Sequence, residues 1–425
     1  MQRRKTALCR VPRNQSGAAL LVFLLVAVIA ALGFLLNRLT SSPTANSNPA
    51  TARNLALAKE AIVGWSASDD TTPGKLPCPE DYSLIGTVNE GRAMSSCSNS
   101  LPVIGRLPWR TLGLPRLLDA AGEPLWYVLS PGFRNAPINS DSPAQLSVDG
   151  APGSAVAIIF SPGPPVANQN RPIPTAATPP DIAQYLEGTN NSGTGNFITK
   201  NADLPFNDLL LAISARDLFS VVEKRVAREI RQELLKFFCG VDNFTESGAC
   251  IAAGGNRFFP RPADFSDPTC LGSTAIPSNC NSSAANNAGR LPANPATAWE
   301  PPASSLLRGT IFSAPNWFQK NGWREQVYYA VANACIDGTS NCSGSGMLTV
   351  NQPPQSPLTN QRAVIIVGGS ALSTTAPAQM RSTALDKITL SNYLEDENLT
   401  PLDDTYTIQP PNPVAPFNDQ LFSLP

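Results

Sequence analysis

The chain has 425 residues, of which 42% are hydrophobic and only 15% are charged, and its formal net charge is −1. A nearly neutral chain has no overall charge that would attract DNA, RNA or anionic lipid, so we expect no nucleic-acid partner. Histidine is absent, which removes the commonest general base and a common ligand of zinc and copper. We therefore predict that the protein is not an enzyme and has no catalytic residue, no metal site and no cofactor.

Residues 1–17 form a basic leader with no acidic residue, and an unbroken apolar run follows from Ala18 to Leu36. As a helix this run is roughly 28 Å long, close to the thickness of the hydrocarbon core of a bilayer. We predict a transmembrane helix over residues 18–39, with the leader in the cytoplasm and everything after Arg38 outside it. A cleaved secretory signal, whose apolar region is usually shorter, and an unprocessed signal anchor are the alternatives.

The junction Asn14-Gln15-Ser16-Gly17 followed by Ala18-Ala19-Leu20-Leu21 resembles the processing site of prepilins, over about the first forty residues. The resemblance implies that prepilin peptidase cuts between Gly17 and Ala18. It also implies a membrane-anchored subunit of a type IV pilus or type II secretion pseudopilus that assembles with other pilin-like subunits. Such a protein lies in the bacterial inner membrane, with its C-terminal domain periplasmic or surface-exposed. Val22 stands where type IV prepilins usually carry Glu, a residue that the tip-located minor pseudopilins also lack.

After a linker at residues 40–50, which two prolines interrupt, the chain carries the same order of segments twice. Each copy opens with a predicted helix, at 51–65 and at 216–238, and Ser214 and Asp217 form a capping box for the second. Later segments are closely similar: YLEGTN (185–190) with YLEDEN (393–398), and FNDLL (206–210) with FNDQL (417–421). Behind the transmembrane helix we predict an α+β fold of two tandem helix-plus-antiparallel-sheet modules, residues 51–212 and 213–425.

The first copy contains the block LPCPEDY (76–82), GRLPWRTLGL (105–114) and LWYVL (125–129). This block resembles a motif set in predicted periplasmic proteins with prepilin-type leaders. In the second copy Pro260-Arg261-Pro262 replaces Pro77-Cys78-Pro79. We expect proline-flanked turns and core packing of Trp109, Trp126 and Tyr127 rather than a binding site, because aromatic residues more often pack than bind.

One of the nine cysteines, Cys9, lies in the leader, which leaves an even number outside it. An even number in an oxidising compartment predicts a disulfide framework. The short separations favour sequential pairs: Cys78 with Cys97, Cys239 with Cys250, Cys270 with Cys280, and Cys335 with Cys342. Metal or redox chemistry is the alternative, but no C-x-x-C motif and no histidine supports it.

Three groups of charged residues have both a structural and a functional interpretation. The acidic stretch Glu395-Asp396-Glu397, with Asp403 and Asp404, offers Ca²⁺ ligands, but we favour a solvated loop. The basic residues of helix 216–238 alternate with acidic ones, so ion pairs explain them better than nucleic-acid binding. Asp208 and Asp419 of the repeated FND suggest paired catalytic carboxyls, although Asn-Asp is ordinary turn chemistry.

Three functions therefore compete. We favour the pilin-like subunit, which predicts a mature N-terminus at Ala18. The alternative is a membrane-anchored periplasmic binding or adhesive protein unrelated to pili, whose anchor could be exchanged without loss of function. The third is a carboxylate enzyme acting on glycans, which would need two carboxyls in one pocket.

Overall fold

The structure, a computed structural model, describes residues 48–166, 168–202, 205–240, 242–272, 280–283, 286–292, 317–336, 342–372, 378–399, 404–409 and 417–425. The chain divides into two compact units, residues 1–52 and 53–425. The helices and strands lie in the second unit, apart from the first residues of helix α2 (Pro49–Ser68). We call residues 53–213 its first half and residues 214–425 its second half.

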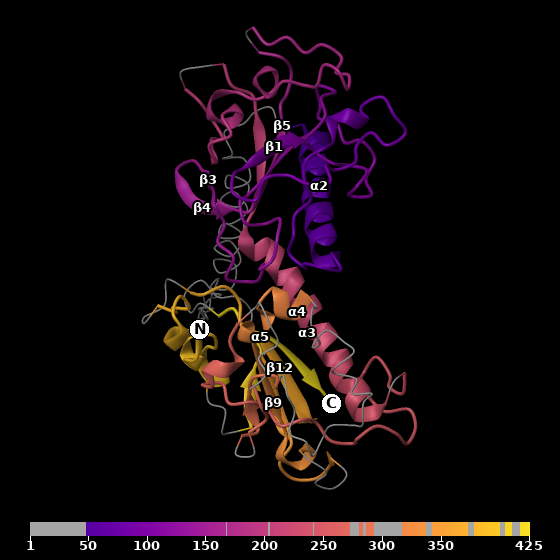
Figure 1. Cartoon of the computed structure of the whole chain (residues 1–425), viewed down its shortest axis with the longest axis vertical. Helices are drawn as coiled ribbons and strands as arrows, with labels where there is room; N and C mark the ends of the chain where they lie inside the picture. Colours follow the sequence, from indigo (N-terminus) through magenta and orange to yellow (C-terminus); the bar gives the residue numbers. More distant parts are fainter. Residues whose placement is uncertain are drawn as a thin grey trace, which may run out of the picture. The chain divides into compact units, whose positions relative to one another are not determined.

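The first half contains a four-stranded antiparallel sheet in the order β1–β2–β5–β7. Its strands are β1 (Val103–Arg106), β2 (Trp126–Leu129), β5 (Ala157–Ser161) and β7 (Leu209–Ile213). A three-stranded sheet follows the order β4–β3–β6. Its strands are β3 (Leu146–Val148), β4 (Ala151–Ala155) and β6 (Asn196–Phe197). Figure 1 shows β1 and β5 beside α2.

The two faces of the four-stranded sheet are buried against different partners, because successive strand residues point to opposite sides. Tyr127 and Ile159, which are paired across β2 and β5, share a hydrophobic cluster with Ile62 of α2. Trp126 and Phe160 belong to a second cluster, together with residues of the three-stranded sheet. The four-stranded sheet therefore lies between a helical layer and a second sheet.

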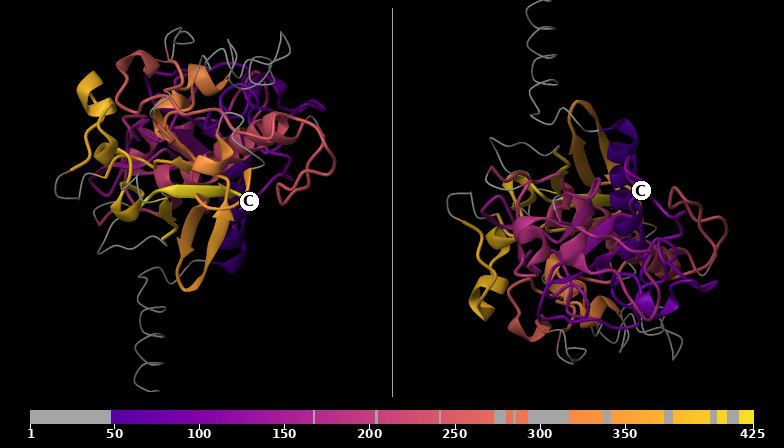
Figure 2. Two further views of the ribbon diagram at one scale, coloured as in Figure 1. Left: turned by 90° about the horizontal axis from the view of Figure 1, so that it is seen from below. Right: turned by 90° about the horizontal axis from the view of Figure 1, so that it is seen from above.

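The second half repeats this arrangement of strands. A four-stranded antiparallel sheet has the order β14–β12–β9–β8, and a three-stranded sheet the order β11–β10–β13. The strands are β8 (Ala288–Gly289), β9 (Val327–Val331), β10 (Leu348–Gln352), β11 (Gln355–Gln361), β12 (Ala363–Val367), β13 (Thr405–Thr407) and β14 (Gln420–Leu424). The antiparallel pair β10–β11 is visible as two orange arrows in Figure 2.

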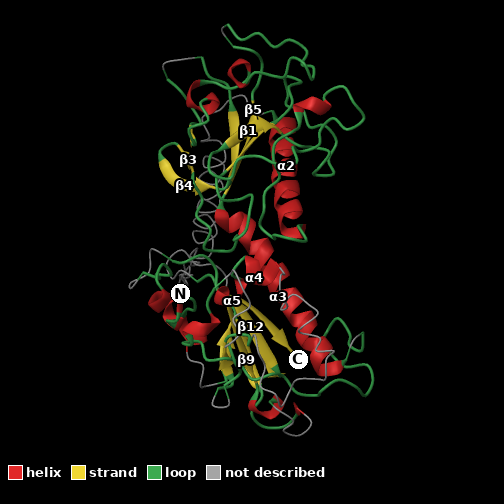
Figure 3. Cartoon of the chain, viewed as in Figure 1, coloured by secondary structure: helices red, strands yellow, loops and turns green. Residues whose placement is uncertain are grey.

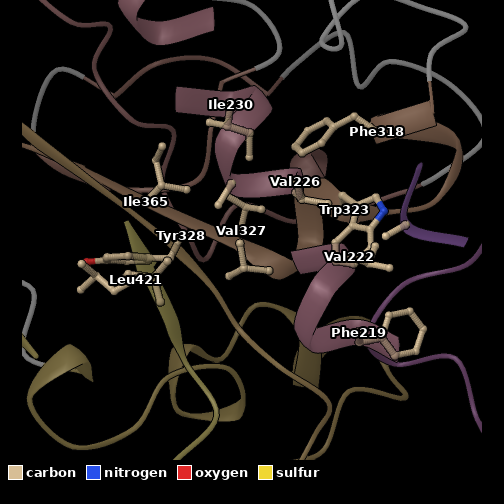
Figure 4. Close-up of a cluster of buried hydrophobic side chains, with 14 of the residues drawn as sticks. Phe219, Val222, Val226, Ile230, Phe318, Trp323, Val327, Tyr328, Ile365 and Leu421 are labelled. Atoms are coloured by element: carbon tan, nitrogen blue, oxygen red, sulfur yellow. The ribbon is translucent and has the colours of Figure 1, made fainter. Parts of the chain in front are cut away.

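Helix α3 (Ala215–Cys239) is the long helix of the second half and packs on β12 and β14. It begins at the predicted capping box, in which Ser214 Oγ accepts from Asp217 N–H at 3.1 Å. Its buried stripe includes Val222, Val226 and Ile230, which lie in one cluster with Trp323 (Figure 4). The predicted helix at 216–238 is therefore confirmed. Its apolar period and its cap are both signals within the local sequence.

The other helices of the described residues are short and lie in the connections before and between strands (Figure 3). The α-helical turns are α4 (Trp317–Lys320), α5 (Trp323–Gln326) and α6 (Ala384–Lys387). The 3-10 turns are η1 (Tyr82–Leu84), η2 (Ile182–Gln184), η3 (Gly188–Asn191), η4 (Pro268–Cys270), η6 (Asn333–Cys335), η8 (Leu390–Asn392) and η9 (Asp396–Leu399). The predicted helix at 51–65 is confirmed, as part of α2.

The predicted fold class is wrong. Among the described residues, no helix combines the length and the apolar character that a bilayer crossing requires, and the segment 18–39 lies outside the described residues. The modules are also not purely antiparallel, because β3 pairs with β6, and β10 with β13, in parallel. The structure supports an α+β fold with several sheets and few helices. The predicted domain boundaries stay predictions.

Four disulfides cross-link the described chain in the sequential pairs that the short separations predicted. They join Cys78 to Cys97, Cys239 to Cys250, Cys270 to Cys280, and Cys335 to Cys342. Each closes a local loop that contains prolines, glycines or small polar residues and therefore has little hydrophobic core of its own. Such cross-links restrict the unfolded chain and persist in oxidising compartments.

Candidate functional site

Buried carboxyls form a polar network at the start of β7 in the first half. Asp208 Oδ2 accepts hydrogen bonds from the Glu187 N–H and from Asn190 Nδ2, both at 2.9 Å. Glu187 Oε2 in turn accepts from the N–H groups of Asn207 and Asp208, at 3.0 and 3.1 Å. We call Glu187, Asn190 and Asp208 the first Glu–Asn–Asp network. It fastens the loop around η3 to the start of β7.

The second half contains the same network at the matching residues. Asp419 Oδ2 accepts from the Glu395 N–H at 3.2 Å and from Asn398 Nδ2 at 2.9 Å. Glu395 Oε2 accepts from the Asn418 N–H at 3.0 Å. Glu395, Asn398 and Asp419 form the second Glu–Asn–Asp network. Asp208 and Asp419 are only 2% and 5% exposed, and both accept hydrogen bonds that hold a neighbouring loop.

Burial shifts the ionisation of both aspartates. Burial, and then the carboxyl of Glu187, raise the pKa of Asp208 to about 8. Burial and Glu395 likewise raise the pKa of Asp419 well above its ordinary value. Desolvation and a neighbouring negative charge both disfavour the ionised carboxyl. At neutral pH Asp208 therefore keeps its proton, and the pKa of Asp419 is shifted in the same direction.

A glutamine and an arginine complete each network, and the sequence analysis missed them. In the first half Gln169 Nε2 donates to Glu187 Oε1 at 2.8 Å, and Arg171 Nη2 donates to Gln169 Oε1 at 2.6 Å. In the second half Gln379 donates to Glu395 at 2.6 Å, and Arg381 donates to Gln379 at 3.2 Å. The repeated Gln-x-Arg is the signal that could have found them. Because both halves carry these networks, we interpret them as scaffold.

The first half carries a different feature, a small hollow with a volume of about 10 Å³. Its apolar walls are Leu107, Leu117, Pro124 and Leu125. Its polar and aromatic walls are Glu80, Arg106, Trp109 and Arg116. This volume is about that of one water molecule and far below the roughly 300–1,000 Å³ of a site for a drug-sized ligand, so the hollow has room for the tip of a polar group at most.

The backbone of the LPCPEDY segment and of β1 sets the polar side of the hollow. Glu80 N–H donates to the Arg106 carbonyl at 2.9 Å, and Arg106 N–H donates to the Tyr82 hydroxyl at 3.0 Å. The disulfide between Cys78 and Cys97 anchors the same segment. Glu80 and Arg106 are therefore held side by side, and each is only 3% exposed.

Trp109 is fixed at the hollow by a glycine. Gly91 has a φ of +88°, and a Cβ at this position would lie 2.2 Å from Trp109 Cε2. Only glycine allows the ring to approach the backbone this closely. The Arg110 N–H also donates to the Gly91 carbonyl at 2.9 Å. The half-buried Trp109 thus lines the hollow, and the expectation that it packs only in the core is corrected.

The charges around the hollow are incompletely paired. Arg106 Nη2 donates to the Tyr185 hydroxyl at a long 3.3 Å, and Arg106 Nε is buried with no hydrogen-bond acceptor among the described residues. Arg116 Nη1 lies 3.2 Å from Glu90 Oε1. Burial raises the pKa of Glu80, and the positive charge of Arg106 opposes this shift in part. The hollow therefore holds two guanidinium groups and a carboxyl that ionises reluctantly.

The corresponding position of the second half lacks this chemistry. Equivalent residues of the two halves are identified by their backbone hydrogen bonds. Ala263 N–H donates to the Arg290 carbonyl, and Glu80 N–H donates to the Arg106 carbonyl in the same way. Ala263 thus replaces Glu80, and Phe265 replaces Tyr82. The guanidinium of Arg290 donates to the carbonyls of Phe265 and Glu325, both at 3.0 Å. It also donates to further backbone carbonyls. Arg290 is satisfied by the fold itself, whereas Arg106 is not.

The other predicted sites have mixed outcomes. Gly17 and Ala18 lie outside the described residues, as does Asp403. Glu395 is buried in its network, so the prediction of a fully solvated acidic loop was wrong for this residue, whereas Asp396 and Glu397 are exposed. Within the described ranges, no group of three or more cysteines or carboxylates could hold a metal ion. Sequence reasoning missed Glu80, Arg106 and Arg116, although a comparison of Glu80 with Ala263 was possible.

No protein-family model, curated protein or solved structure matches this chain.

Proposed function

We propose that this protein is a non-enzymatic ligand-binding protein of an oxidising, extracytoplasmic compartment, and that its ligand binds at the surface beside the half-buried Trp109, with no more than the tip of a polar group reaching into the hollow of the first half. One observation carries the proposal. The two halves share the strand order and the Glu–Asn–Asp networks, but only the first half has a carboxyl, a tyrosine hydroxyl and an incompletely paired arginine at this position. Residues kept for folding alone would not need to differ in this way.

The chemistry of the hollow favours binding over catalysis. Its lining contains no hydroxyl, thiol or amine that could act as a nucleophile. Its one carboxyl, Glu80, has no second carboxyl in the lining to act with, as paired acid and base catalysis would require. Guanidinium groups stay protonated and act as hydrogen-bond donors. The four disulfides support an oxidising compartment.

Saturation-transfer NMR on the full-length protein tests this proposal. The probes are a mixture of small organic acids, amines, neutral amides and monosaccharides. We expect at least one probe to bind saturably, and Trp109→Ala to weaken its binding by about tenfold, since the ring provides much of the contact area. Arg92→Ala, an exposed side chain of the same half that does not line the hollow, is the matched control and should bind like the wild type. Binding that is equal in the Trp109 variant, or no binding at all, would contradict the proposal.

The prepilin-type junction supports a second candidate function, that of a pilin-like subunit. Its observation is the sequence at Gly17 and Ala18, which lies outside the described residues. In this case prepilin peptidase removes residues 1–17, and the mature chain associates with other pilin-like subunits. Mass spectrometry of the mature N-terminus tests it. An N-terminus at Ala18 supports the candidate, and an intact leader or a cut near Ala45 contradicts it.

A further inference from the structure

Residues 138–142 of the first half form a loop that contacts the second half, and we call them the bridging loop. Ser140 Oγ donates to Glu223 Oε1 of α3 at 2.6 Å. Asp141 Oδ1 accepts from Arg381 Nη1 at 2.9 Å. The bridging loop therefore joins the halves through α3 and through the segment that follows β12.

The two halves differ in the partner of their repeated arginine. Arg171 pairs with Glu123 of its own half, with 3.3 Å between Nη1 and Oε1. The matching Arg381 pairs instead with Asp141 of the other half. Gln326, just before β9, donates to the same Asp141 carboxylate. The second Glu–Asn–Asp network and its arginine are therefore completed by a residue of the first half.

Glu223 is the carboxyl to which both halves donate. Besides the bond from Ser140, its Oε2 accepts from Gln420 Nε2 of β14 at 2.6 Å. Both donors are neutral, and Glu223 is only 4% exposed. The nearby Arg381 is already paired with Asp141. An ionised Glu223 has therefore lost its water without gaining an ion pair of its own, which is costly.

Burial is the largest influence on the ionisation of Glu223. It raises the pKa of this carboxyl from the ordinary 4.5 to about 7, although the hydrogen bonds from Ser140 and Gln420 oppose the shift. Two charged groups also act on it: Arg381 lowers the pKa and Asp141 raises it. A carboxyl in this place changes its charge near neutral pH.

We propose that the bridging loop is a pH-dependent joint, which holds the two halves together while Glu223 is protonated and loosens when Glu223 is ionised. When the loop moves away, Glu223 meets water and returns to its ordinary acidity, so opening releases a proton. A step that releases a proton is favoured as the pH rises. The joint is therefore closed below about pH 7 and opens more often above it. This inference goes beyond the proposed binding function, because no residue of the joint lines the hollow.

Hydrogen exchange of the full-length protein, followed by mass spectrometry at pH 6 and pH 8, tests the joint. The peptide that contains Ile138 reports it, because the Ile138 N–H donates to Asn321 Oδ1 of the second half at 2.8 Å. After correction for intrinsic exchange, the protection of this peptide should fall about tenfold from pH 6 to pH 8. This factor follows from a pKa of about 7 in the closed joint and 4.5 in the open one.

Glu223→Gln should remove this fall, because glutamine imitates the protonated carboxyl at every pH. Asp208→Asn is the matched control, since it neutralises a buried carboxyl outside the joint and should leave the fall in place. A fall of the same size in the Glu223 variant, or no fall in the wild type, would overturn the proposal. So would protection of the bridging loop equal to that of β2 and β5, because the loop would then open only when the whole fold unfolds.

Asp141→Asn gives a second measurement that does not alter Glu223 itself. The amide keeps an acceptor for Arg381 and removes the charge that disfavours ionised Glu223. The fall in protection between pH 6 and pH 8 should therefore be smaller than in the wild type. An unchanged fall in this variant would also contradict the joint.

Discussion

Glu80 lies inside an apolar hollow and beside a cation, and these surroundings act on its carboxyl in opposite directions. Burial is the larger effect and raises its pKa above the ordinary value of 4.5, while the positive charges of Arg106 and Arg116 lower it and the carboxyl of Glu90 raises it further. The carboxyl of Glu80 is therefore harder to ionise than that of an exposed glutamate.

Asp208 makes the stability of the folded protein depend on pH. Its pKa is about 8 in the folded protein and about 3.9 in an unfolded chain. Between these values the folded state holds a proton that the unfolded state has released, so the free energy of unfolding falls as the pH rises. The stabilisation is complete below about pH 4 and is lost as the pH passes through about 8.

Asp208→Asn should flatten this dependence, because an amide keeps the Oδ acceptor for Glu187 N–H and Asn190 and cannot ionise. We expect the unfolding temperature of the variant to change less than that of the wild type between pH 6 and 9, in thermal melts followed by circular dichroism. Asp419→Asn is the matched variant in the second half and should act in the same direction. An unchanged slope in both variants would contradict a protonated carboxyl in either network.

At the scale of single elements, α3 is fixed by signals within its own sequence. Ser214 and Asp217 satisfy each other's backbone N–H groups at its start. Ser214→Ala should therefore lower the free energy of unfolding by about 1 kcal/mol, measured by urea denaturation. Thr383 makes the same capping box on α6, a helix of four residues with none buried. Thr383→Ala should cost less than about 0.5 kcal/mol, because little depends on that turn. Equal costs for the two variants would argue against this account.

These local signals explain how much of the fold could be predicted from the sequence. The apolar stripe of α3 and the short cysteine separations need only neighbouring residues, so the helix and the disulfide pairs could be predicted. Strands β3 and β6 have three and two residues and pair in parallel over a long separation. Nothing in a segment this short specifies its partner, so the mixed sheets could not be predicted.

The candidate site escaped prediction for a related reason. Glu80 lies in a proline-rich segment without periodicity, and its burial depends on Arg106 and Trp109, which come from a distant part of the sequence. Whether a polar residue is exposed, satisfied or left facing a hollow is a tertiary property. The difference between Glu80 and Ala263 was present in the sequence, but its meaning depended on knowing that both occupy the same place beside an arginine.

At the scale of the second unit, one hydrophobic cluster includes residues of both halves, among them Ile62, Tyr127, Val226 and Ile365. Polar contacts reinforce it. Ile138 N–H of the first half donates to Asn321 Oδ1 of the second at 2.8 Å, and Asn139 Nδ2 donates to the Asn321 carbonyl at 2.7 Å. A shared core of this kind predicts that the two four-stranded sheets unfold together, in one cooperative transition.

Asn321→Ala should weaken this coupling, because it leaves the buried Ile138 N–H without its acceptor. An unsatisfied buried donor costs about 1–3 kcal/mol. Hydrogen exchange followed by mass spectrometry, in increasing urea, reports β2 and β5 separately from β9 and β12. In the wild type both sets should lose protection at the same urea concentration, and in the variant their midpoints should separate. Asn54→Ala removes an amide that donates to the Leu118 carbonyl within the first half, so both midpoints should stay together. Separate midpoints already in the wild type would mean that the shared cluster does not join the halves into one folding unit.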